Sequence, residues 1–234
     1  MHATAAAPAE EWGAEELLRD MLAEYRGRIA LVSSFGAESA VVLHMVAGLD
    51  RSTAVIFLDT GKLFPETLVY RDRLVAQLGL TDIRTAEPEP ARIAAVDPDG
   101  TLWRSDPDVC CWQRKVEPLD EALSGFDAWI TGRKRYQGGL RRSLPMIEHG
   151  SDGRTKINPL AGWSLADIAR YFAEHDLPRH PLSAHGYNSI GCTTCSRPGA
   201  PADDPRAGRW VGFDKNECGI HLPRVAPLSR TLQP

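Results

Sequence analysis

The sequence predicts one α/β domain, in which helices flank a mainly parallel sheet, followed by an irregular C-terminal tail. Short apolar runs alternate with segments of helical spacing over the first part of the chain, which is typical of βαβ units. The 234 residues are enough to bury a complete core. Beyond residue 176, Pro and Gly are frequent and periodicity is lost. We therefore expect a flexible segment over 1–15, the α/β domain over 16–200 and a tail over 201–234.

The first βαβ unit is the clearest. Residues 29–32 form a short apolar run, as expected of a buried parallel strand. Small residues over 33–39 make the turn into a helix predicted over 40–49, where apolar side chains recur at helical spacing. Residues 54–58 are a second buried strand, which ends at the polar turn 59–61.

The later elements are shorter or less regular. Pro65 suits the first turn of a helix. Residues 83–85 and 128–131 are the third and fourth predicted strands, and Ser164 is a good N-cap for a helix over 165–174. Because ligands bind at the carboxyl ends of parallel strands, we expect the functional site where these strands end.

The composition is that of an ordinary globular protein. Hydrophobic residues make up 43% and charged residues 25%, which excludes the disordered, collagen-like and coiled-coil classes. The net charge of −4 gives no sign of a nucleic-acid partner. No run approaches the roughly 20 apolar residues that span a bilayer, and the start lacks the features of a signal peptide. We therefore expect a cytoplasmic protein without a membrane partner, whose cysteines stay reduced.

The turn over 33–39 is a candidate anion site. It leads from a strand into a helix N-terminus, where backbone N–H groups and the helix dipole attract anions. It lacks the Gly-Lys-Ser/Thr ending of a Walker-type loop. A plain tight turn would contain the same residues, so this segment alone leaves both interpretations open.

Four of the five cysteines are candidate metal ligands. Cys110 and Cys111 are adjacent, and Cys192 and Cys195 form a Cys-x-x-Cys pair. Four thiolates suit tetrahedral zinc or an iron–sulfur cluster, although structural zinc ligands are usually two to four residues apart. Two unrelated pairs of buried or redox thiols would leave the same pattern. The spacing favours a metal centre without deciding between zinc and a cluster.

Cationic residues gather after the fourth predicted strand. Residues 133–142 contain five Lys or Arg side chains and no acid. Arg206, Arg209 and Arg224 add cations further along the chain. A solvated basic face is the simple alternative. In an acidic protein, however, cations at strand ends favour a small, highly charged anion as ligand.

The fifth cysteine, Cys218, lies in the sequence Glu-Cys-Gly-Ile-His, with His221 three residues later. A cysteine beside cations ionises readily and is then a good nucleophile. A lone cysteine is often inert, but its polar, Gly-flanked surroundings favour reactivity.

Taken together, these motifs resemble those of the bacterial assimilatory adenylyl-sulfate (APS) reductases that carry a [4Fe–4S] cluster, a branch of the APS/PAPS reductase family. The matching segments follow the family's order and are 33–39, 58–61, 110–119, 132–137, 190–195, 208–210 and 217–221. The resemblance implies an adenine nucleotide alpha hydrolase-like fold. It also implies reduction of APS to sulfite and AMP through an enzyme S-sulfocysteine, in sulfate assimilation and cysteine biosynthesis.

The resemblance also implies roles for single residues. Cys110, Cys111, Cys192 and Cys195 match the cluster ligands, and Cys218 matches the nucleophile. Arg142 matches a substrate-binding arginine, with Arg141 as the alternative under a one-residue gap. The other implied substrate contacts are Ser33, Gly36, Leu58, Gly61, Lys115, Gly132, Arg206, Arg209 and His221.

This chain departs from the family pattern at two places. Tyr136 stands where the family often has an acid, and residues 138–142 differ from the commoner form of the loop. The chain also lacks the thioredoxin-like domain of the plant enzymes, so the resemblance implies thioredoxin or glutaredoxin as external reductant. The oligomeric state stays open, including a homo-oligomer.

Three other functions compete with this interpretation. A reductase for 3′-phosphoadenylyl sulfate (PAPS) is the nearest, but those enzymes usually lack the four cysteines. An ATP pyrophosphatase shares the strand–loop–helix start, but the residues over 33–39 match its loop poorly. A non-catalytic, metal-dependent binding module would leave Cys218 and the cations without a role.

Overall fold

The computed structural model describes residues 13–199, 201 and 204–222. The predicted flexible segment 1–15 lies almost wholly outside these residues, as does the predicted tail beyond 222. Within the described residues, the helices are too short or too polar to cross a membrane.

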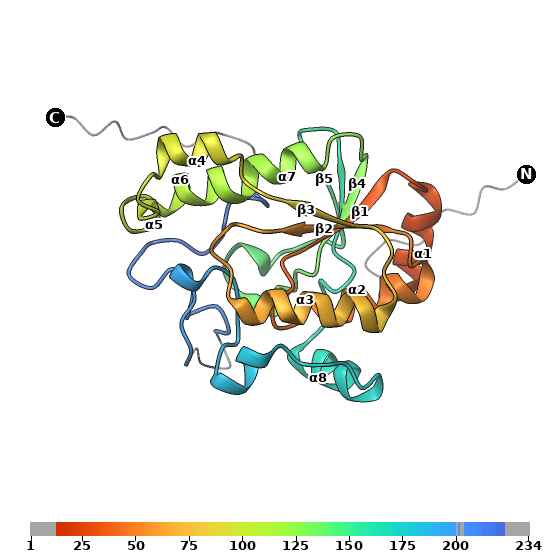
Figure 1. The fold of residues 1–234 in the computed structure, drawn as a ribbon. Coiled ribbons are helices and arrows are strands. Elements are labelled where there is room, and N and C mark those ends of the chain that lie inside the picture. The colour runs from red at the N-terminus through yellow and green to blue at the C-terminus, as the bar shows by residue number, and fades with distance from the viewer. Residues whose placement is uncertain (1–12, 200, 202–203, 223–234) are drawn as a thin grey trace, which may run out of the picture.

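The core of the fold is a six-stranded sheet of order β3-β2-β1-β4-β6-β5. All neighbouring strands are parallel except β5, which runs antiparallel to β6 at one edge. This confirms the predicted mainly parallel α/β fold (Figure 1). The strands are β1 (Ile29–Ser33), β2 (Ala54–Leu58), β3 (Ile83–Ala86), β4 (Ala128–Ile130), β5 (Ile147–His149) and β6 (Thr155–Ile157).

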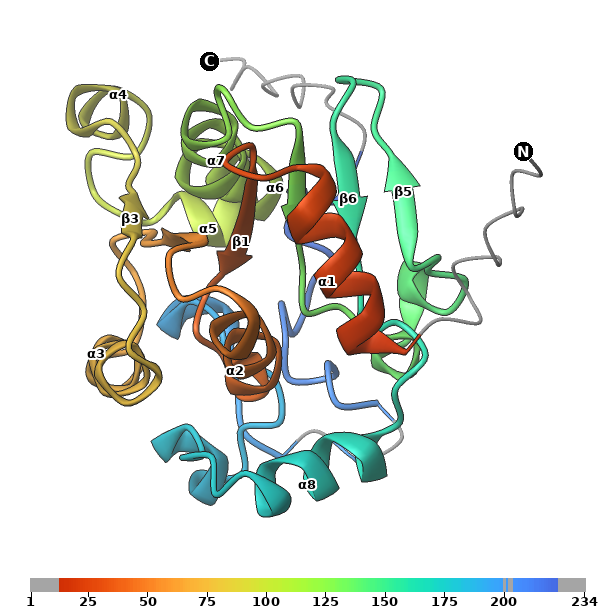
Figure 2. The ribbon, with the colours of Figure 1, turned by 90° about the vertical axis from the view of Figure 1, so that its right-hand side faces the viewer.

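Helices cover both faces of the sheet. Figure 1 shows α4, α6 and α7 on one face and α2 and α3 on the other, with α8 beyond them; Figure 2 shows α1 beside α2. The α-helices are α1 (Ala14–Glu24), α2 (Ser39–Leu49), α3 (Pro65–Leu78), α4 (Pro90–Val96), α5 (Leu102–Ser105), α6 (Pro107–Cys111), α7 (Glu117–Ala122) and α8 (Leu165–Glu174). A π-helix (Trp112–Val116) joins α6 to α7, and short 3-10 turns follow at Arg135–Gln137, Gly139–Arg141, Pro181–His185 and Thr193–Cys195.

The central strands are apolar on both faces because both faces are covered. In β1, Ile29 and Leu31 pack into the layer with α1, α2, α3 and α8, whereas Ala30 and Val32 pack into the smaller layer with α7. Every residue of β1 and β2 is buried. Continuous apolar runs of this kind are what a strand covered on both faces requires.

The irregular C-terminal segment is held across the carboxyl edge of the sheet. An isolated antiparallel bridge between Leu63 and Cys192 joins it to the segment after β2, and a second bridge, between Ser196 and Arg209, joins two parts of the segment itself. This segment therefore closes over the ends of β1, β2 and β4, where the sequence predicts the functional site.

A buried histidine at the start of the Pro181–His185 turn makes stability depend on pH. His180 is 1% exposed; its Nδ1 accepts from the Leu182 N–H at 3.2 Å, and its Nε2 lies 3.0 Å from Thr67 Oγ1. Burial lowers the pKa of His180 from 6.5 to about 4. The unfolded chain thus takes up this proton first as the pH falls, and about 3 kcal/mol of folding free energy is lost between these two pH values.

We expect His180→Asn to have a flatter pH dependence of stability than the parent chain. Asparagine keeps an acceptor for the Leu182 N–H but has no titrating group. Urea unfolding at a series of pH values between 6.5 and 4 measures the difference. Parallel stability curves for the two proteins would contradict this assignment.

Candidate functional site

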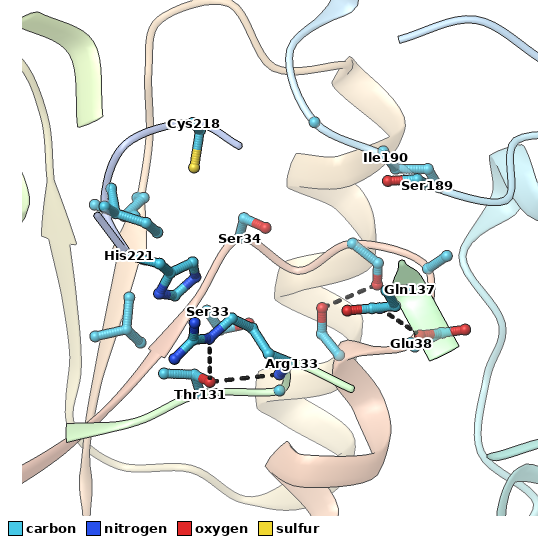
Figure 3. A pocket seen from close by; sticks show the side chains of 18 of the residues that line it. Ser33, Ser34, Glu38, Thr131, Arg133, Gln137, Ser189, Ile190, Cys218 and His221 are labelled. Atoms are coloured by element: carbon cyan, nitrogen blue, oxygen red, sulfur yellow. Dashed lines mark hydrogen bonds between the residues drawn. The ribbon is translucent and has the colours of Figure 1, made fainter. Parts of the chain in front are cut away.

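A cavity opens at the carboxyl ends of β1, β2 and β4, beneath the C-terminal segment (Figure 3). The structure brings together in its lining most of the residues that the sequence singles out. These are Ser33, Gly36, Leu58, Lys115, Gly132, Arg206, Arg209, Cys218 and His221.

Two of the predicted residues lie elsewhere in the described structure. Arg142 is outside the cavity lining, whereas Arg141, the alternative, is 8% exposed and lines it. Gly61 is also outside the lining: its N–H donates to Asp59 Oδ1 at 2.9 Å, and its φ of +66° needs glycine for the turn after β2. Of these two neighbouring arginines, Arg141 is therefore the one that faces the cavity.

The turn after β1 forms one wall of the cavity. Phe35 has a φ of +47° and is fully buried, edge-on to Phe57 at 5.4 Å, and its N–H donates to Ser33 Oγ at 3.1 Å. A side chain at Gly36 would meet the Ile190 carbonyl at 3.2 Å. The turn therefore packs closely against the C-terminal segment that covers it.

The carboxylate of Glu38 joins this turn to the loop after β4. It accepts from Lys134 Nζ at 2.6 Å, from Gln137 Nε2 at 3.1 Å and from the Tyr136 hydroxyl. Burial raises the pKa of Glu38, but the Lys134 charge and the three donors outweigh it and hold the pKa below its usual value. Tyr136, a departure from the family pattern, thus has a structural partner that the sequence does not reveal.

A cationic wall faces this turn. Arg133 is buried and pairs with Glu148, and its Nη2 also donates to Asn158 Oδ1 at 3.1 Å. Arg206 and Arg209 lie over the ring of Trp210, with their Cζ atoms 5.6 and 4.5 Å from its centroid. Sequence reasoning singled out the last two arginines but missed Arg133, Lys134 and Gln137 as individual cavity residues.

Cys218 and His221 lie at one side of the cavity, and Glu38 and Gln137 at the other (Figure 3). Cys218 is partly exposed. His221 stacks on Trp129 with the rings 5.5 Å apart and 6° from parallel. Burial, reinforced by Arg133 and Arg141, lowers the pKa of His221 well below its usual value. The imidazole is therefore neutral at physiological pH, on the same side of the cavity as the Cys218 thiol.

The other four cysteines are buried. Cys110 and Cys111 end α6, whose first turn Asp106 caps by accepting from the Val109 N–H at 2.9 Å. Cys192 lies 3.2 Å from Thr60 Oγ1. Three of the four thiols, those of Cys111, Cys192 and Cys195, share one apolar cluster with Trp210.

The surroundings of the four buried cysteines include polar groups that lack a partner in the described structure. In the described part of the chain, no three Cys, His, Asp or Glu side chains form a compact cage for one metal ion. Two buried N–H donors beside the cysteines, Arg114 Nε and Trp210 Nε1, have no hydrogen-bond partner among the described residues. Buried donors without acceptors are rare. An iron–sulfur cluster, whose sulfur atoms accept hydrogen bonds, would give both donors a partner.

The π-helix aims two consecutive cations inward. Arg114 Nη2 donates to Asp97 Oδ2 at 2.8 Å, and its Nη1 donates to the Thr60 carbonyl at 3.0 Å. Lys115 is 9% exposed and lines the cavity. Burial lowers the pKa of Lys115, but the charges of Cys192, Cys218 and Cys111 outweigh this and raise it above its usual value. Lys115 is thus within electrostatic reach of the Cys218 thiol and of two of the buried cysteines.

The chain is similar to known proteins in sequence and in fold. Residues 28–198 match the family model of the phosphoadenosine phosphosulfate reductase domain. A curated relative from Mesorhizobium japonicum, named adenosine 5'-phosphosulfate reductase, is 53% identical over 91% of this chain and 80% of its own. Among solved structures, the phosphate complex of the Candida auris PAPS reductase has a TM-score of 0.68 and 30% identity, covering 79% of this chain and 90% of its own. The FMN adenylyltransferase of Candida glabrata shares the fold at a TM-score of 0.58, with 14% identity over 85% of this chain and 70% of its own.

Proposed function

Because this chain belongs to the phosphoadenosine phosphosulfate reductase domain family, we propose that it reduces APS to sulfite and AMP in sulfate assimilation, for cysteine biosynthesis. One observation carries the proposal: the partly exposed thiol of Cys218 lies in a cation-lined cavity, close to Lys115 and packed against the cluster that contains Cys111, Cys192 and Cys195. The names of the curated relatives support APS as the substrate. We place the reaction in the cytoplasm, where these thiols stay reduced.

In the first half-reaction, the Cys218 thiolate attacks the sulfur of APS. The bond between that sulfur and the bridging phosphate oxygen breaks, and AMP leaves with the electron pair. The product is an S-sulfocysteine at Cys218. Cations that surround the thiol, Lys115 and Arg209 among them, stabilise the negative charge that develops on the phosphate.

In the second half-reaction, a dithiol protein such as thioredoxin or glutaredoxin regenerates the enzyme. One of its thiolates attacks the Cys218 sulfur, and sulfite leaves with the bonding electrons. The partner's second thiol then resolves the mixed disulfide and restores the Cys218 thiol. The two electrons thus come from the dithiol, which is oxidised to a disulfide.

The four buried cysteines, Cys110, Cys111, Cys192 and Cys195, would hold a [4Fe–4S] cluster. The unpaired N–H groups of Arg114 and Trp210 support this assignment, since both lie beside the thiols. When bound, the cluster would hold the surrounding segments in place and contribute to the electrostatic field of the site. Lys115 then holds its positive charge toward the sulfate end of the substrate.

PAPS is the second candidate substrate, because the similar Candida auris structure is a PAPS reductase. The test is to supply the anaerobically purified holoenzyme with either nucleotide and a dithiol, and to measure sulfite and AMP. We expect equimolar products from APS, and a kcat/KM for APS that exceeds that for PAPS about tenfold or more. A higher kcat/KM for PAPS would reassign the substrate. Absence of sulfite from both would refute the proposed function.

A further inference from the structure

The residue before the nucleophile is a buried carboxylate. Glu217 is 5% exposed, and both of its oxygens accept from Arg141, Oε2 from Nη2 at 2.9 Å and Oε1 from Nε. Arg206 Nη2 lies 3.6 Å from the same Oε2. We call these three residues the Glu217 clamp.

The Glu217 clamp joins two walls of the cavity. Arg141 ends the 3-10 turn after β4, whereas Glu217 and Arg206 belong to the C-terminal segment. Arg206 Nη2 also donates to the Asn216 carbonyl at 2.7 Å, so the backbone on the N-terminal side of Glu217 is held as well. Because Cys218 follows directly, these contacts hold the backbone immediately before it.

This carboxylate is unusual in a cavity built for an anion. Arg141 and Arg206 both line the cavity, and Glu217 neutralises part of their charge. Burial raises the pKa of Glu217, but Arg141, then Arg206 and Arg133, outweigh this and hold the pKa below its usual value. Glu217 is therefore ionised and competes electrostatically with any phosphate or sulfate group for these arginines.

The clamp also fixes the orientation of Arg141. The Nε and Nη2 atoms of Arg141 donate to Glu217, and its Nη1 donates to Gln137 Oε1. A guanidinium has five N–H groups, so a second N–H on each terminal nitrogen stays available to a ligand. An arginine held in this way loses little side-chain entropy when an anion binds.

We propose that Glu217 is a positioning residue that holds Cys218 over the cavity and orients Arg141 for the phosphosulfate, at the expense of affinity for the nucleotide. This inference rests on the proposed function and deepens it. It predicts opposite effects on two steps, because the same charge weakens anion binding and promotes sulfur transfer. If Glu217 only stabilised the fold, removing its charge would change nucleotide binding and sulfur transfer in the same direction.

The decisive variant is Glu217→Gln, which keeps the shape of the side chain and removes its charge. We expect AMP to bind several-fold more tightly, because two arginines are no longer neutralised. We expect iodoacetamide to alkylate Cys218 of the substrate-free holoenzyme about tenfold faster, because the thiol is no longer held against the cavity. In a single turnover with APS, sulfur transfer to Cys218 should be about tenfold slower or more.

Glu148→Gln is the matched control. Glu148 pairs with Arg133, which also lines the cavity, but Glu148 lies on β5 and not on the segment that carries Cys218. It should therefore leave the alkylation rate unchanged. Cys218→Ser supplies the background of alkylation at other thiols. If Glu217→Gln does not fold, Arg141→Gln breaks the same pair from the other wall and should release Cys218 to the same extent.

Unchanged alkylation of Cys218 in folded Glu217→Gln, or weaker AMP binding together with slower transfer, would overturn the inference. Alkylation and AMP binding need no turnover. Failure of the parent enzyme to make sulfite from APS would therefore refute the proposed function, whereas these two measurements judge the Glu217 clamp separately.

Discussion

Cys218→Ser is expected to abolish sulfite formation from APS, with a loss of about a thousandfold or more in kcat. Serine differs from cysteine by one atom and is a far weaker nucleophile at neutral pH. Cys218 is only partly buried, so the variant should fold normally. Steady-state assays of sulfite, with and without a dithiol, measure the effect.

Nucleotide binding distinguishes loss of chemistry from loss of the site. The cations that line the cavity are unchanged in Cys218→Ser, so AMP should bind with an affinity close to that of the parent enzyme. Visible absorption, iron content and melting temperature should also be unchanged. Sulfite formation at more than a few per cent of the parent rate would mean that another group is the nucleophile.

The second large effect is expected for Cys192→Ser, which removes one of the four buried thiols. Burial raises the pKa of Cys192, but Lys115, the Thr60 hydrogen bond, Arg209 and Arg114 together outweigh it and lower the pKa, so this thiol is suited to bind metal as a thiolate. Cys192 also pairs with Leu63 across the isolated bridge that fixes the C-terminal segment. Loss of this ligand should therefore remove the cluster and disorder the cavity together.

Iron and sulfide analysis of anaerobically purified protein measures this effect. The parent chain should carry about four irons and absorb in the visible range. Cys192→Ser should have a much lower iron content and much weaker visible absorption. APS reduction should fall about a hundredfold or more. Thr194→Ala is the matched control, because it changes a neighbouring side chain that is not a thiol. An iron content equal to that of the parent chain in Cys192→Ser would contradict the assignment.

Much of the fold could be predicted because its central strands are apolar along their whole length. The predicted strands over 29–32 and 54–58 agree with β1 and β2 to within one residue. β5 and β6 were not predicted: each has three residues, and both contain charged or polar side chains. Their pairing with each other and with β4 sustains them, and such long-range pairing leaves no periodic signal in a short segment.

The site could be predicted wherever residue type alone indicates the chemistry. In a chain whose thiols stay reduced, two close pairs of cysteines indicate a metal centre, and a fifth cysteine near a histidine indicates a nucleophile. Arg141 and Arg142, in contrast, are neighbouring cations that the sequence cannot rank. Glu217, 76 residues away, decides which of them faces the cavity.

The contacts of Glu38 illustrate the same limit. Its three donors, Lys134, Tyr136 and Gln137, lie 96 to 99 residues away in the chain. A buried ion pair of this separation depends on how two loops pack, which no local pattern encodes. The π-helix over Trp112–Val116 is similar, because it buries the consecutive cations Arg114 and Lys115, and a π-helical turn leaves no signal in residue spacing.

The mass of Cys218 after a single turnover tests the central claim most directly. The parent holoenzyme is mixed with APS in the absence of any thiol, digested, and examined by mass spectrometry, while AMP is measured in the same sample. The account predicts one SO3 group on the peptide that contains Cys218, in equal amount to AMP, and its release as sulfite when a dithiol is added. AMP formation without this adduct, or an adduct on any other cysteine, would contradict it.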